Sequence, residues 1–119
     1  MSPSPAFVTA DEVTRELHRV ADRLRVVGPR LAARSEQSEA STVIGRTRTV
    51  LQQLADLASG DTSREVPELA PHALGDQTLV LGQEVLRAAR TARERGDDDR
   101  ATHLLAECGA LLEGLRKTL

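Results

Sequence analysis

The sequence predicts an all-α protein, a four-helix up-down bundle with a fifth short helix as an option after Gly28-Pro29. Apolar residues recur at spacings of three and four in four separate stretches, which is the pattern of a helix with one buried side. No stretch alternates strictly between apolar and polar residues, and no Asn-Gly pair indicates a hairpin. The 119 residues suit one hydrophobic core, so we expect a single domain over 10–119 after a flexible tail of 1–9.

The first helix is expected over residues 10–27, where apolar residues follow a heptad pattern. Thr9 and Glu12 have the spacing of a capping box, in which each side chain bonds to the other residue's backbone N–H. The apolar stripe consists of Val13, Leu17, Val20, Leu24, Val27 and Leu31.

Gly28-Pro29 is expected to end this helix at a corner. Glycine is common at helix C-termini, and proline inside a helix costs about 3 kcal/mol. The alternative is a kinked helix, because Leu31 keeps the phase of the stripe. A second helix is expected over 29–59, with a weak point near 35–39 where the apolar rhythm is lost.

The last two helices are expected over 71–95 and 97–118. A crossing loop over residues 60–70 precedes them, and Gly96 separates them by a short connection, which favours antiparallel neighbours. The second and fourth helices each carry two adjacent apolar columns instead of one.

Composition excludes several classes of function. Phe7 is the only aromatic residue, so stacking on single-stranded nucleic acid or on sugars is disfavoured. The net charge of −2 gives no bulk attraction to DNA or to anionic lipid. No apolar run reaches the length of about 18 residues that a membrane span needs. Arginine is far more frequent than lysine, with Lys117 as the only lysine, which is typical of a bacterium with GC-rich codons.

No motif of catalysis or metal binding was found in the chain. Cys108 falls in the apolar stripe of the last helix, which indicates a packed thiol rather than a nucleophile. Asp99, His103 and Glu107 share one side of that helix, but no second cluster of ligands matches them. We therefore expect no enzymatic activity, no cofactor and no metal. The lone cysteine and the absence of a signal-peptide pattern favour a cytoplasmic location.

The wide apolar stripes predict a module for self-association or protein–protein interaction. Their second columns exceed what three neighbouring helices need to cover, and an uncovered apolar patch usually marks an interface. We expect a homodimer or a complex with another helical protein. The candidate interaction face consists of Ile44, Leu51, Ala58, Leu104 and Leu111.

Two alternative functions rest on weaker clusters. A nucleic-acid-associated regulator would use the basic face of the first helix, although paired acidic residues on the same helix make a solvated face the simpler reading. A small-ligand-binding bundle would use a polar patch in the third helix. The basic face consists of Arg15, Arg19, Arg23 and Arg30, and the polar patch consists of Asp76, Gln77 and Thr78.

Overall fold

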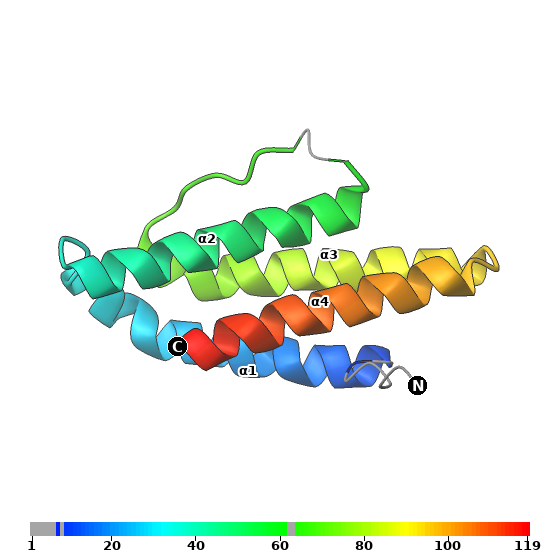
Figure 1. The fold of residues 1–119 in the computed structure, drawn as a ribbon, viewed down its shortest axis with the longest axis horizontal. Helices are drawn as coiled ribbons and strands as arrows, with labels where there is room; N and C mark the ends of the chain where they lie inside the picture. Colours follow the sequence, from blue (N-terminus) through cyan, green and yellow to red (C-terminus); the bar gives the residue numbers. More distant parts are fainter. Residues whose placement is uncertain (1–6, 8, 62–63) are drawn as a thin grey trace, which may run out of the picture.

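The computed structural model describes residues 7, 9–61 and 64–119, and these form a bundle of four long helices (Figure 1). The helices are α1 (Ala10–Ala33), α2 (Ser38–Ser59), α3 (Leu74–Glu94) and α4 (Asp98–Thr118), with a 3-10 turn, η1 (Pro71–Ala73), before α3. No strand occurs in the described part of the chain, so the predicted all-α four-helix bundle is confirmed. Most of the predicted tail lies outside the described residues. None of the described helices is long and apolar enough to cross a membrane.

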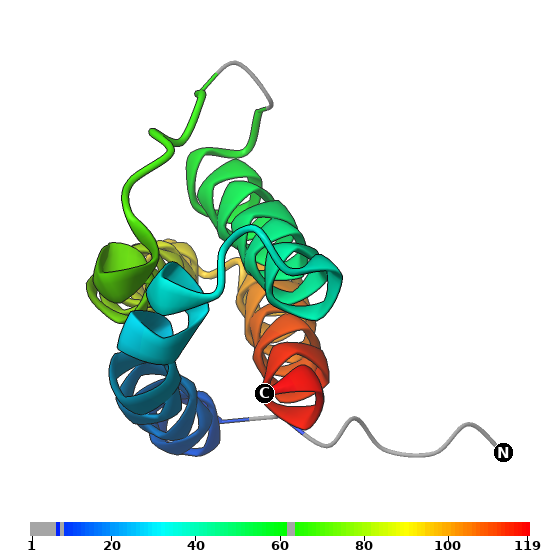
Figure 2. The same cartoon turned by 90° about the vertical axis from the view of Figure 1, so that its left-hand side faces the viewer.

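The hairpin of α3 and α4 forms the centre of the bundle. Both outer helices pack against this pair, whereas α1 and α2 contact each other only slightly. Viewed along the bundle, α1 and α2 therefore lie at opposite corners (Figure 2). The short connection between α1 and α2 carries the chain from one side of the central pair to the other.

The helices run up, down, down and up, which differs from a strictly alternating order. Figure 1 shows α2 and α3 running in one direction and α1 and α4 in the other. The reason is the long connection of residues 60–70, which returns along the bundle so that α3 begins near the start of α2. We call residues 64–69 of this connection the strap.

The strap is fixed by side chains from both helices that it crosses. The amide of Gln52 on α2 bonds to the strap backbone with both its nitrogen and its oxygen, as a neighbouring strand would. The bonds are Gln52 Nε2 to Arg64 O (2.6 Å), Val66 N to Gln52 Oε1 (3.1 Å), Arg48 Nη2 to Leu69 O (2.9 Å) and Gln77 Nε2 to Pro67 O (3.0 Å). The strap is thus held against α2 and α3 by four hydrogen bonds.

The corner predicted at Gly28-Pro29 is wrong, and no separate fifth α-helix follows it in the described chain. α1 continues through Pro29 to Ala33, and the chain turns at 34–37, close to the predicted weak point. Gly28 serves close packing instead of a turn, because a Cβ there would lie 2.9 Å from the backbone oxygen of Pro71. This contact with the η1 turn fixes the end of α1 as a helix despite the proline.

Caps and close packing define the rest of the bundle. The predicted capping box is confirmed, since Thr9 N donates to Glu12 Oε1 at 3.0 Å and Glu12 N donates to Thr9 Oγ1 at 3.2 Å. The core is made almost entirely of leucine, valine and alanine. Leu17 of α1 is 1% exposed, and its side chain packs directly on Gly82 of α3, which has no side chain of its own.

Candidate interaction groove between α2 and α4

A groove with an apolar part and a more polar part runs between α2 and α4, which lie antiparallel. It has two adjoining parts, of about 580 and 350 Å³, that share Leu111. The first part is lined by Thr42, Gly45, Arg46, Thr49, Val50, Ala110, Leu111, Gly114, Leu115 and Thr118. The second is lined by Gln53, Asp56, Leu57, Gly60, Asp61, Arg100, His103, Leu104, Glu107 and Leu111. We call the two parts together the α2–α4 groove.

Small residues create the floor of this groove. A Cβ built on Gly45 or on Gly114 would meet nothing within 4 Å, so both helices expose open backbone here. Val50 and Leu111 stand beside these open positions and are only half-buried. One face therefore carries both open backbone and partly exposed apolar side chains.

Opposite charges lie toward the two ends of the groove. Arg46 precedes Val50 by one helical turn on α2, and Glu107 precedes Leu111 by one turn on α4. Because the two helices are antiparallel, these charges lie on opposite sides of the centre at Val50 and Leu111, about 12 Å apart along the groove. Both side chains are exposed, and neither forms an ion pair with another described residue.

Three of the five residues of the predicted interaction face are buried. Ile44 is 6% exposed and Leu51 and Leu104 are 1% exposed, so these three belong to the core. Each of α2 and α4 packs on more than one neighbour, and this packing buries the second apolar columns. Leu111 does line the groove, whereas Ala58 lines a separate cleft at the end of α2. The small residues at 45, 110 and 114 are the sequence signal that points to the groove.

The predicted polar patch does not form a common pocket. Asp76 is exposed and pairs with Arg25 at 3.2 Å, Gln77 holds the strap, and Thr78 is buried and donates to Leu74 O at 2.7 Å. A hollow of about 400 Å³ borders Asp76 and Gln77, but its other lining residues come from the strap, η1 and α3. Thr78 is not among the described residues that line this hollow.

The predicted basic face is exposed, and three of its four arginines make a polar contact within the chain. Arg15 Nε donates to Asp11 O at 3.5 Å, and Arg23 Nη2 donates to Leu119 O at 3.3 Å. Arg19 pairs with Glu16 at 3.8 Å, whereas Arg30 is simply exposed near the end of α1. Nothing in this geometry favours a duplex-binding surface.

Glu16 is a structural residue that the sequence pattern did not reveal. It is 4% exposed, and Arg116 Nε of α4 donates to Glu16 Oε1 at 2.5 Å, which raises the pKa of Arg116. Its position next to Leu17 and three residues after Val13 places it at the edge of the buried stripe. The pair joins α1 to α4 near the C-terminus.

The remaining candidates do not form a reactive centre. Cys108 is fully buried, and desolvation raises the pKa of its thiol to about 12. Asp99, His103 and Glu107 are exposed, and no group of three or more potential metal ligands converges within the described residues. The chain matches no protein-family model, no curated protein and no solved structure.

Proposed function

We propose that this protein is a self-association module that pairs with a second copy through the α2–α4 groove. The observation that carries the proposal is the self-complementary character of that face. A two-fold axis through the region of Val50 and Leu111 would pack these half-buried apolar side chains of one copy against the same side chains of the other. An isologous interface requires that a single surface carries both members of every contacting pair.

The charges support the same axis. A rotation of 180° about the groove centre exchanges its two ends, so Arg46 of one copy comes to lie near Glu107 of the other. The pair forms twice in a dimer, because each copy contributes both partners. Neither Arg46 nor Glu107 has an ion-pair partner among the described residues of its own chain. The two intermolecular pairs would therefore fix the register of the dimer.

The size of the face is adequate for a small dimer. Helices of about 20 residues are roughly 30 Å long, and two of them side by side are roughly 20 Å wide. A stable interface needs about 800 Å² of accessible surface from each partner. The α2–α4 face offers roughly 600 Å² in projection, which is the size of a weak, reversible interface rather than of a stable one.

We expect the wild-type chain to dimerise reversibly in sedimentation equilibrium, and Gly114→Arg to be monomeric over the same concentrations. The arginine would fill the depression that the second copy enters, while open space around Gly114 lets the monomer keep its fold. Gln83→Arg is the matched control, because Gln83 is exposed on α3 outside the groove. Circular dichroism should show unchanged helix content in both variants.

Charge reversal tests the register of the dimer. Arg46→Glu and Glu107→Arg should each weaken dimerisation about tenfold or more, because each creates two like-charged contacts. The double variant Arg46→Glu/Glu107→Arg should recover most of the lost affinity. If the double variant dimerises as weakly as the single variants, this register is refuted. If the wild-type chain stays monomeric at every concentration, self-association is refuted, and the groove would instead suit a helix of another protein.

A further inference from the structure

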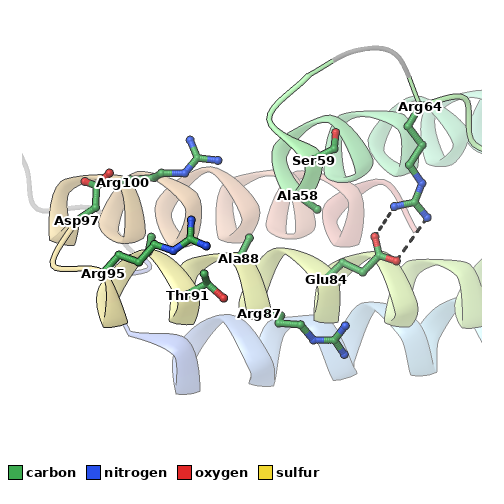
Figure 3. Close-up of a pocket in the computed structure, with 11 residues that line it drawn as sticks. Ala58, Ser59, Arg64, Glu84, Arg87, Ala88, Thr91, Arg95, Asp97 and Arg100 are labelled. Carbon is green, nitrogen blue, oxygen red and sulfur yellow. Dashed lines mark hydrogen bonds and ion pairs between the residues drawn. The ribbon is translucent and has the colours of Figure 1, made fainter.

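A second cleft, separate from the centre of the α2–α4 groove, collects arginine side chains from three segments of the chain. It lies where α2 ends, beside the C-terminal half of α3 and the start of α4, and has a volume of about 660 Å³ (Figure 3). Among the described residues, its charged lining consists of Arg64, Arg87, Arg95, Arg100, Glu84 and Asp97. We call it the arginine cleft.

Both acidic side chains of the cleft are already engaged. Glu84 pairs with Arg64 of the strap at 2.5 Å, and this bond raises the pKa of Arg64. Asp97 caps α4, where its Oδ1 accepts from Arg100 N at 3.1 Å. The guanidinium groups of Arg87, Arg95 and Arg100 make no ion pair and no side-chain hydrogen bond with any described residue.

Two of the three unpaired cations, Arg95 and Arg100, lie close together at one end of the cleft (Figure 3). Arg95 extends from the end of α3 and Arg100 from the start of α4, whereas Arg64 lies at the other end of the cleft, turned toward Glu84 (Figure 3). Arg87 extends along the outer side of α3 and forms the rim. A concave site with uncompensated positive charge focuses the potential and attracts anions.

Small side chains leave room for a ligand between these cations. Ala58, Ala88 and Ala92 line the cleft, so no bulky group fills it. Its volume is within the range of about 300–1,000 Å³ that is usual for small-molecule sites. With Phe7 as the only ring in the chain, the site offers no aromatic platform for a base, so recognition would rest on the anionic group itself.

We propose that the arginine cleft binds the pyrophosphate group of a compact phosphorylated ligand. The two neighbouring guanidinium groups of Arg95 and Arg100 match an anion with two charged centres, and their planar forks suit phosphate oxygens. A long polyanion is disfavoured, because the exposed carboxylates of Asp97, Asp98 and Asp99 stand at one end of the cleft. The site thus selects a short anion over a nucleic-acid backbone.

Isothermal titration calorimetry with inorganic pyrophosphate tests this site. We expect saturable binding at one site per chain, weakened at least about tenfold in Arg95→Gln/Arg100→Gln, which loses two charge-assisted donors. The matched control is Arg15→Gln/Arg30→Gln, which removes the same charge from the exposed face of α1 and should bind within about twofold of wild type. Arg100→Lys should bind with intermediate affinity, because it keeps the charge and loses the fork.

Two further measurements separate the possible causes of a change. Sedimentation should show the same oligomeric state for both double variants, a necessary check because Arg100 also borders the α2–α4 groove. If the cleft recognises the anion alone, a nucleoside diphosphate should compete with pyrophosphate at similar affinity. Much tighter binding of the nucleoside diphosphate would identify a nucleotide as the source of the pyrophosphate group. Absence of binding, equal weakening in both double variants, or binding of duplex DNA without binding of pyrophosphate would overturn the proposal.

Discussion

Leu17→Ala is expected to lower the free energy of unfolding by about 4 kcal/mol, near the upper end of the range for buried leucine. Leu17 is 1% exposed and lies directly on Gly82 of α3. Its neighbour has no side chain that could move into the space, so truncation leaves a cavity between two helices. Urea unfolding followed by far-ultraviolet circular dichroism measures this loss, since the chain has no Trp or Tyr for fluorescence.

Because of the same contact, we expect Gly82→Ala to destabilise the wild-type protein and to stabilise the Leu17→Ala variant. In the wild type a Cβ at this position would overlap the side chain of Leu17, and overpacking of this kind costs about 1–3 kcal/mol. In the Leu17→Ala background the methyl group enters the cavity and adds helix propensity, so it should stabilise by about 0.5–1 kcal/mol.

Gly45→Ala, measured in dilute solution, is the control for the effect of helix propensity alone. Its Cβ meets nothing within 4 Å, so it should stabilise by about 0.5–1 kcal/mol in both backgrounds. If Gly82→Ala had equal effects with and without Leu17, the direct contact between the two positions would not determine the packing of α1 on α3.

Cys108 is expected to resist thiol reagents in the folded protein by several orders of magnitude relative to the unfolded chain. Burial raises the pKa of its thiol to about 12, so almost no thiolate exists at pH 8, and the reagent has no access to the core. Modification should therefore follow global unfolding. Labelling with a disulfide reagent at increasing urea concentrations measures this, and a fast urea-independent phase in the native protein would contradict the burial.

The raised pKa also predicts how stability depends on pH. The unfolded thiol ionises at about 8.5 and the folded thiol near 12, so the unfolded state loses its proton first as pH rises. Stability from this group is fully present below pH of about 8.5 and decreases between there and pH 12, by about 2 kcal/mol at pH 10. The difference between wild type and Cys108→Ala isolates this contribution, because the other basic groups are common to both. Parallel pH profiles would refute it.

The helices could be predicted from the sequence because their signals are local. The heptad stripe, the Thr9–Glu12 capping box and the loss of apolar rhythm before α2 each depend on neighbouring residues. The interruption at Gly28-Pro29 was predicted from the same kind of rule, but there the tertiary contact with η1 decided the outcome. A glycine that permits close approach cannot be distinguished from one that permits a turn until its neighbour in space is known.

The two candidate sites depend on features that the sequence does not localise. Adjacent apolar columns indicate how much of a helix is buried, but not whether the covering surface comes from the same chain. For this reason the sequence alone places Ile44 and Leu51 at an interface, whereas in the structure they are covered by helices of the same chain. The arginine cleft forms because the strap returns along α2 and brings Arg64 to Glu84. No periodicity in residues 60–70 encodes that path.

The placement of α1 and α2 on opposite sides of the α3–α4 hairpin makes the domain thermodynamically indivisible. Neither the first half of the chain nor the second encloses a complete core, because the outer helices pack on the central pair and hardly on each other. Loss of either outer helix would expose one side of that pair to water. The bundle should therefore unfold in a single cooperative transition, and its two helix pairs act as complementary parts of one folding unit rather than as separable hairpins.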